Sequence, residues 1–131
     1  MGVKYPEMRL NLWAAARDLG DPEFQQAVWA QAKAPTPGKR FPFHEAIAYV
    51  LDDLDVPSPQ SLIGDVLISS SELALLSRLS ALLSVVLSRV GGTAAYGEVA
   101  QDAAWHEVIS AARALRDAIE RGDRLQDGRE G

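Results

Sequence analysis

The sequence predicts an all-α protein, a compact bundle of five or six helices joined by short connections. Apolar residues recur at three- and four-residue spacing in five segments, which is the pattern of the buried side of an amphipathic helix. Proline, glycine and N-cap residues stand at the ends of these segments. Only residues 66–68 have the composition of a strand. We expect them to form a buried extended connection, because no second strand-like segment is present to pair with them.

The first three predicted helices lie before residue 55. Pro6 favours a helix start, since proline is tolerated in the first turn, and Gly20 favours the end of that helix. Asp21 is a typical N-cap residue and begins a second helix that extends to about residue 33. A third helix is expected over about residues 42–54, where apolar side chains again follow the helical period.

The strongest helix signal begins at Ser69. Ser69 and Glu72 have the spacing of a capping box, and the apolar pattern then continues to about Val90. Because this segment is apolar on most sides, we expect it to be the central helix of the bundle. It also carries a row of small residues that would allow a neighbouring helix to approach closely: Ser77, Ser80, Ala81, Ser84 and Ser88.

The last predicted helix is capped by Asp102. Its core side contains apolar residues at helical spacing: Trp105, Val108, Ile109, Ala112, Leu115 and Ile119. From Gly122 the sequence is polar, with Leu125 as its one large apolar residue. We therefore predict a single helical domain over residues 1–121 and a flexible C-terminal tail over residues 122–131.

Composition and charge exclude several classes of protein. The 131 residues contain no cysteine, which excludes a disulfide framework, a thiol nucleophile and a thiolate zinc site. The net charge of −5 disfavours nucleic acid as a partner, because an acidic protein repels phosphate groups. The N-terminus has no apolar signal segment, and the most apolar stretch contains arginines and serines, so we expect a cytoplasmic protein without a membrane span. No residue pattern indicates a cofactor.

The acidic residues are concentrated in one segment. Residues 41–72 contain neither lysine nor arginine but six acidic residues: Glu45, Asp52, Asp53, Asp55, Asp65 and Glu72. Acids near a helix C-terminus oppose the helix dipole, which indicates that their charge has a role. The hypothesis we favour is a non-catalytic protein-binding module of the immunity or antitoxin kind, which captures a basic partner protein. The predicted contact residues are Asp52, Asp53, Asp55 and Asp65, with Tyr49 at the rim of the surface.

Three other interpretations remain open. In the first, the acidic segment is only solvated, as most charge runs are. In the second, His44, Glu45 and Asp52 belong to a small enzyme or a divalent-metal site, although the segment lacks the spaced ligands and the glycine of an EF-hand loop. In the third, the small residues on the 72–90 helix mediate self-association into a homodimer instead of internal packing.

Five motifs are distributed along the chain. They are residues 1–9, residues 21–29, the Asp52-Asp53 pair, Ile63-Gly64-x-x-Leu67 and Tyr96-x-x-Val99-x-x-Asp102-x-x-Trp105-x-x-Val108-x-x-Ala111. Together they resemble a family of short actinobacterial proteins of unknown function, over the chain to about residue 119. The resemblance implies no catalytic residues. Residues 44–112 are also similar to immunity proteins of bacterial contact-dependent growth inhibition, through the acidic helix end, the long leucine helix and the last motif. That similarity implies a protein partner.

Overall fold

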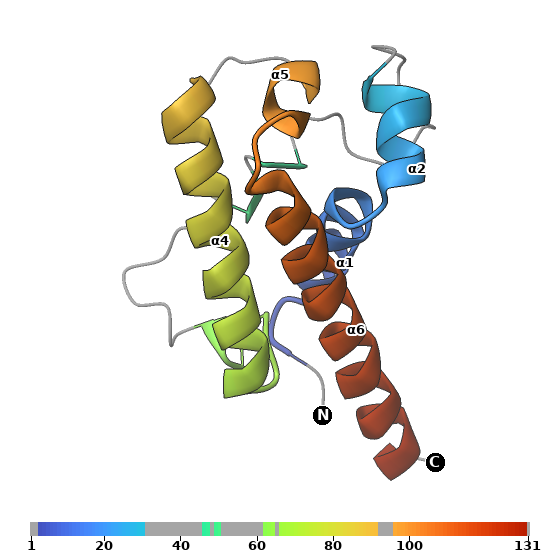
Figure 1. Cartoon of the computed structure of the whole chain (residues 1–131). Helices are drawn as coiled ribbons and strands as arrows, with labels where there is room; N and C mark the ends of the chain where they lie inside the picture. Colours follow the sequence, from blue (N-terminus) through green and yellow to red (C-terminus); the bar gives the residue numbers. More distant parts are fainter. Residues whose placement is uncertain are drawn as a thin grey trace.

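The computed structural model describes residues 3–30, 46–47, 49–50, 62–64, 66–91 and 96–130, apart from the side chains of residues 28 and 124–130. These residues form an all-α protein (Figure 1). Besides helices and turns, the described residues contain one isolated bridge, between Ile63 and Leu67. The predicted all-α fold is therefore confirmed for the part of the chain that the structure describes.

Helix α1 spans Pro6–Leu19, as the sequence predicts. Pro6 stands at its start, where the missing N–H costs no hydrogen bond. At the other end, the N–H of Gly20 donates to the carbonyl of Ala16 at 3.0 Å. A Cβ atom on Gly20 would lie 2.9 Å from Cγ of Arg113 on the C-terminal helix. Glycine therefore both ends α1 and allows the close approach of the C-terminal helix.

The segment after α1 is helical but is not one regular α-helix. Helix α2 covers Pro22–Phe24, and its N-cap Asp21 accepts a hydrogen bond from the N–H of Phe24 at 3.1 Å, which confirms the predicted cap. The chain then widens into a π-helical turn, η1, over Gln25–Trp29. This turn differs from the predicted α-helix, and its first residue, Gln25, is buried.

Helix α4 spans Ser70–Val90 and has the predicted bounds. The hydroxyl of Ser69 accepts the N–H of Glu72 at 3.2 Å, which is one half of the predicted capping box. In the other half, the carboxylate of Glu72 accepts the N–H of Ile68 at 2.9 Å, where a capping box would use the N–H of Ser69. The carboxylate of Glu72 therefore reaches one residue farther back along the chain than in a regular box.

Helices α5 (Tyr96–Ala100) and α6 (Trp105–Glu130) complete the described fold. The carboxylate of Asp102 accepts the N–H of Ala104 at 2.8 Å, at the start of α6. Helix α6 lies between α4 and α1 and contacts both (Figure 1). The prediction that the 69–90 helix is central is therefore wrong among the described elements. The side of α4 opposite its buried leucines contains mainly serine and alanine, which gain little free energy from burial.

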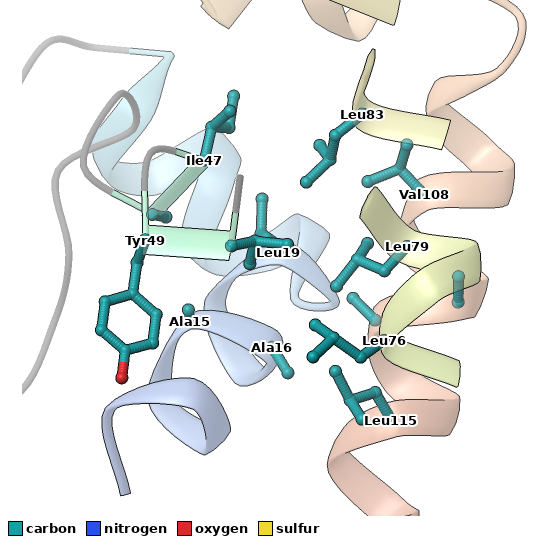
Figure 2. Packing of buried hydrophobic residues seen from close by; sticks show 14 of the residues in the cluster. Ala15, Ala16, Leu19, Ile47, Tyr49, Leu76, Leu79, Leu83, Val108 and Leu115 are labelled. Carbon is teal, nitrogen blue, oxygen red and sulfur yellow. The ribbon is translucent and has the colours of Figure 1, made fainter. Parts of the chain in front are cut away.

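The core forms where α1, α4 and α6 meet (Figure 2). Side chains from all three helices are fully or almost fully buried there: Leu12, Ala16, Leu19, Leu76, Leu79, Leu83, Val108, Leu115 and Ile119. The third predicted helix contributes Ala46, Ile47, Tyr49 and Val50, which are also buried. The rest of that helix lies outside the described residues.

The residues before α4 form the buried connection that the sequence predicts, but it is not extended. Val66 and Leu67 are buried. The N–H of Leu67 donates to the carbonyl of Leu62 at 2.9 Å, and the N–H of Gly64 donates to the carbonyl of Leu67 at 2.7 Å. The result is a tight loop in which Gly64 has a φ of +95°, a conformation that favours glycine.

The C-terminal helix continues past residue 121, the predicted end of the domain. Helix α6 extends to Glu130, so the backbone of residues 122–130 is helical. Gly122, the first residue of the predicted tail, is buried within the helix. A Cβ atom there would lie 2.4 Å from Cδ1 of Ile68 and 2.9 Å from Oε2 of Glu72. The glycine is therefore explained by the close approach of α6 to the first turn of α4.

Candidate functional site

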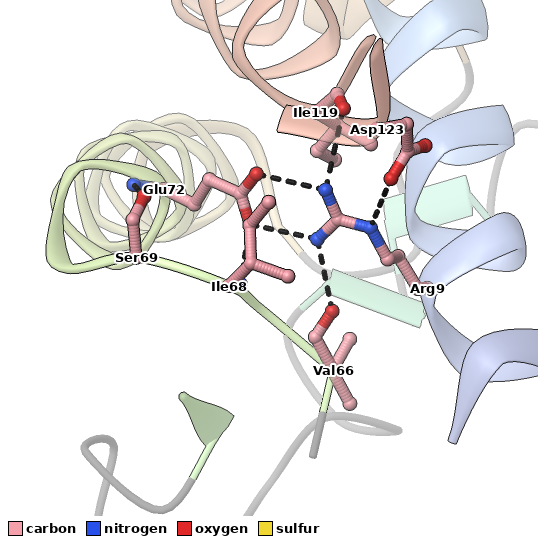
Figure 3. Close-up of polar contacts among 7 residues, drawn as sticks. All are labelled: Arg9, Val66, Ile68, Ser69, Glu72, Ile119 and Asp123. Carbon is pink, nitrogen blue, oxygen red and sulfur yellow. Dashed lines mark hydrogen bonds and ion pairs between the residues drawn. The ribbon is translucent and has the colours of Figure 1, made fainter. Parts of the chain in front are cut away.

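Arg9 of α1 is buried at the point where α1, α4 and α6 meet (Figure 3). Its guanidinium forms a two-pronged ion pair with Glu72 of α4, in which Nη1 donates to Oε1 at 2.7 Å and Nη2 donates to Oε2 at 2.8 Å. Nη1 also donates to the carbonyl of Val66 at 3.1 Å, and Nη2 donates to the carbonyl of Ile119 at 3.2 Å. Nε donates to the carboxylate of Asp123 at 2.9 Å. One side chain thus joins three helices and the loop before α4.

The hydrogen-bonding capacity of Arg9 is fully used. A guanidinium has five N–H donors, and the five contacts with protein oxygens account for all of them. Burial acts to lower the pKa of Arg9, but the hydrogen bonds and charges of Glu72, and then of Asp123, outweigh burial and raise that pKa above its ordinary value. Arg9 is therefore a permanent cation that has no donor left for a ligand. We interpret the Arg9–Glu72 pair as structural.

A second buried polar site forms around Gln25, which is 0% exposed. Its Nε2 donates to the carbonyls of Asp18 and Leu19, both at 2.9 Å, at the C-terminal end of α1. Its Oε1 accepts the hydroxyl of Tyr96 and the indole N–H of Trp105, both at 3.2 Å. These four contacts use the whole capacity of the amide. Gln25 thereby connects the end of α1 to α5 and α6.

Aromatic side chains surround Gln25. The rings of Trp29 and Tyr96 are 5.9 Å apart at an interplanar angle of 63°, and those of Tyr96 and Trp105 are 6.1 Å apart at 78°. Both pairs have the edge-to-face arrangement that aromatic rings prefer. Burial raises the pKa of Tyr96 above its ordinary value, and the hydrogen bond from Gln26 partly opposes this shift. The polar atoms of this cluster are engaged with one another within the protein.

These two sites lack the features of a catalytic centre. No buried side-chain nitrogen or oxygen of the described residues is without a hydrogen-bond partner. In the same part of the chain, no group of three or more histidine, aspartate and glutamate side chains is placed to hold a metal ion. Catalysis requires a base, a nucleophile or a ligand that is free to react. The polar side chains around Arg9 and Gln25 are already occupied.

Sequence reasoning misses both Arg9 and Gln25. Arg9 has a signal that could identify it, since it lies one turn before Leu12 and two turns before Ala16 on the apolar side of the first predicted helix. An arginine in such a position indicates a buried partner. Gln25 has no comparable signal, because the wider π-helical turn changes which residues share a face. Glu72 is identified from the sequence only as a cap residue.

The predicted contact residues are only partly described by the structure. Most of them, together with the residues of the alternative metal site, lie outside the described residues: His44, Glu45, Asp52, Asp53, Asp55 and Asp65. Tyr49 is described, and it is 6% exposed (Figure 2). Its hydroxyl donates to the carbonyl of Met8 in α1 at 2.7 Å. Tyr49 is therefore a core residue, which corrects its predicted place at the rim of a partner surface.

The last candidate site is the outward side of α4, which is the side that faces away from the core. We define it as the exposed residues of the helix after its first turn: Ala74, Ser77, Arg78, Ala81, Ser84, Val85, Ser88 and Arg89. Among the described residues, α4 is the one helix that is long and apolar enough to cross a membrane, and most of that length is not buried. A solvated helix face usually carries many charges of both signs. The outward side of α4 instead carries two arginines and no acid.

The fold and these sites define a small all-α domain whose described buried polar groups hold helices together. The chain belongs to the family described as a domain of unknown function (DUF7945), whose model matches residues 3–127. No curated protein and no solved structure matches the chain. Membership of this family agrees with the resemblance to proteins of unknown function, and it assigns no activity.

Proposed function

We propose that this protein is a non-catalytic protein-binding module. The observation that carries the proposal is the outward side of α4, where small and apolar side chains face solvent along a helix whose other side lies in the core. Val85 on this side is 42% exposed. Exposed apolar side chains along a helix are typical of a surface that is covered by another protein.

The two buried polar sites support this function by fixing the scaffold. Arg9 ties α1 to the start of α4 and to α6, and Gln25 ties the other end of α1 to α5 and α6. A surface on a rigid helix binds a partner with a smaller loss of conformational entropy than a surface on a loop. The described interior therefore supports a rigid scaffold, in which every buried side-chain nitrogen and oxygen of the described residues has a hydrogen-bond partner.

The acidic segment is the second surface in this proposal. Of its six acidic residues, Glu72 is neutralised by Arg9, and the proposed contacts with a basic partner are Asp52, Asp53, Asp55 and Asp65. Complementary charge speeds the capture of a partner protein. This charge, together with the resemblance of residues 44–112 to immunity proteins, supports an immunity- or antitoxin-like role in the cytoplasm of an actinobacterium.

A small enzyme or a divalent-metal protein is the weaker candidate. It depends on His44, Glu45 and Asp52, and no contact of a described residue favours it. Calorimetric titration with Mg²⁺, Ca²⁺, Mn²⁺ and Zn²⁺ tests the metal site. A heat of binding that disappears in a His44→Ala variant would favour this candidate over a binding module.

A pull-down from lysate of the source cells, read by mass spectrometry, tests the proposed function. The native chain is one bait, and an Ala81→Gln variant places a long neutral side chain in the middle of the outward side of α4. The matched control is Ser110→Gln, the same kind of change at an exposed position of α6. An Asp52→Asn, Asp53→Asn, Asp55→Asn variant examines the acidic segment.

We expect a protein that the native chain and the Ser110→Gln variant retain, and that the Ala81→Gln variant loses. If a basic protein is retained by every bait except the triple Asn variant, the binding surface is the acidic segment and not the outward side of α4. If no bait enriches any protein, the binding-module proposal is wrong.

A further inference from the structure

We propose that the outward side of α4 binds an acidic amphipathic helix of a partner protein. This inference rests on the proposed function and deepens it by naming the chemistry of the partner segment. It combines three observations: the shape of the exposed face, its apolar edge and the sign of its charge.

The shape of the face suits a helix. Exposed small residues follow one another at alternating spacings of three and four: Ala74, Ser77, Ala81, Ser84 and Ser88. This is the spacing at which two helices pack along a seam, and it repeats the spacing of the buried residues on the other side of α4, which already pack against α6. Small side chains leave shallow positions into which larger residues of a second helix can insert.

The apolar edge of the face lies beside this row. Leu75 and Leu82 are half-buried and seven residues apart, so they lie on one line along the helix, and exposed Val85 follows one turn after Leu82. An amphipathic helix that docks on a protein surface uses apolar anchors at this spacing. The edge therefore supplies the apolar area that such docking requires.

The charge of the face selects an acidic partner. Arg78 and Arg89 lie along the same edge as Leu82 and Val85, and both are exposed. Arg89 pairs with Asp102 at 3.0 Å, whereas Arg78 forms no ion pair with a described residue. The one acid of α4, Glu72, is buried and faces Arg9. A partner helix with carboxylates beside its apolar seam would complement Arg78, whose charge no described acid balances.

Two other occupants fit these observations less well. A second copy of the chain would bring Arg78 against the arginines of the same side, and the one acid of each α4, Glu72, is buried against Arg9. A membrane surface favours helices with lysine or arginine along the polar side and large apolar or aromatic residues on the other. The exposed row of α4 instead consists of alanine and serine.

Two synthetic peptides with the same leucine–alanine seam test the inference. One carries glutamate and the other lysine at the positions beside the seam, and each is titrated into the ¹⁵N-labelled full chain and followed by NMR. We expect the glutamate peptide to shift the amide signals of the outward side of α4 in a saturable way. Arg78→Glu should weaken its binding by about tenfold and favour the lysine peptide, since a charge pair of this size is worth about 1.4 kcal/mol.

The control for Arg78→Glu is Arg121→Glu, the same charge reversal at an exposed position of α6. It should leave the affinity for both peptides unchanged. Equal binding of the two peptides, shifts at other helices, or no binding of either peptide would each overturn the inference. The lysate experiment with Ala81→Gln judges the proposed function separately, because it does not depend on the charge of the partner.

Two further measurements test whether a membrane surface or a second copy of the chain binds to the outward side of α4. Sedimentation of the chain with vesicles of phosphatidylcholine and phosphatidylglycerol should leave it in solution, and co-sedimentation would overturn the inference in favour of a membrane surface. Analytical ultracentrifugation should show a monomer. A dimer that Ala81→Gln dissociates would overturn it in favour of a second copy.

Discussion

Arg9 and Glu72 are separated by 63 residues in the sequence, and their side chains form a two-pronged ion pair in the core, with N–O distances of 2.7 and 2.8 Å. Glu72 is 2% exposed. The pair holds the first turn of α4 against α1, while Gly122 allows α6 to pass directly over it. The pair is therefore the point at which the three long described helices are fixed relative to one another.

Removal of one member of this pair should destabilise the protein strongly. We expect Arg9→Met to lower the free energy of unfolding by about 3–5 kcal/mol, because it leaves the buried carboxylate of Glu72 without its partner. Glu72→Met should cost less than Arg9→Met, since Asp123 still pairs with Arg9 at 2.9 Å. The double variant should lose less than the sum of the two single losses, since it leaves no unpaired charge. Urea denaturation of the four proteins measures the coupling.

Arg116→Met is the matched control for Arg9→Met. Arg116 pairs with Asp117 at 2.9 Å on the surface of α6, and an exposed pair of this kind contributes about 0–1 kcal/mol. Equal losses of stability in Arg9→Met and Arg116→Met would contradict the structural role that we assign to the buried pair.

Replacement of Gln25 should disconnect α1 from α5 and α6. Gln25→Ala leaves the hydroxyl of Tyr96 and the indole N–H of Trp105 without their acceptor, and we expect a loss of about 2–4 kcal/mol in the free energy of unfolding. The control variant Gln101→Ala changes an exposed side chain outside this cluster and should cost about 0.5 kcal/mol or less. Thermal unfolding followed by near-UV circular dichroism tests both variants, and similar effects of the two would refute the prediction.

Gly122→Ala should destabilise the protein because the space for a Cβ atom is occupied. The added carbon would lie 2.4 Å from Cδ1 of Ile68 and 2.9 Å from Oε2 of Glu72, and overpacking of this kind costs about 1–3 kcal/mol. Gly97→Ala in α5 meets no atom within 4 Å, so it should stabilise the protein by about 0.4–1 kcal/mol. Part of the loss in Gly122→Ala should be recovered by adding Ile68→Ala. A stabilising Gly122→Ala would mean that α6 does not approach α4 here.

Tyr96 should make the stability of the protein decrease at alkaline pH. Its pKa in the folded protein is raised above 10.0, its ordinary value, by burial. The unfolded chain therefore loses the Tyr96 proton first, and the contribution of this group is fully present below pH 10 and is lost as pH rises through the folded pKa. The free energy of unfolding, measured in urea between pH 8 and 11, should fall less steeply for Tyr96→Phe than for the native chain. Parallel curves would rule out this role for Tyr96.

Much of the local structure follows from local signals in the sequence. The start of α1 at Pro6, the cap at Asp21 and the bounds of α4 agree with the structure because each depends on residues within one or two turns. Helix α6 continues past residue 121, where the sequence predicts the end of the domain, for a related reason. A glycine before a polar segment looks like a boundary locally, whereas Gly122 is explained by contacts with Ile68 and Glu72, more than forty residues away in the chain.

The candidate surfaces are predictable to different degrees. The small-residue row on α4 is visible in the sequence, but the sequence cannot tell whether that row faces a neighbouring helix or solvent. The same ambiguity explains the core position of Tyr49, whose hydroxyl reaches the carbonyl of Met8 only when the third predicted helix packs on α1. The contribution of the acidic segment stays a prediction.

Helical period and capping are properties of neighbouring residues, so they predict an all-α chain, where its main described helices begin and which of their sides are apolar. The position of α6 between α1 and α4, the pairing of Arg9 with Glu72 and the contacts of Gln25 with three helices are visible only in the folded protein. These relationships depend on contacts between residues that are distant in the chain. Such contacts form when the buried apolar sides pack together and every enclosed polar group must find a partner.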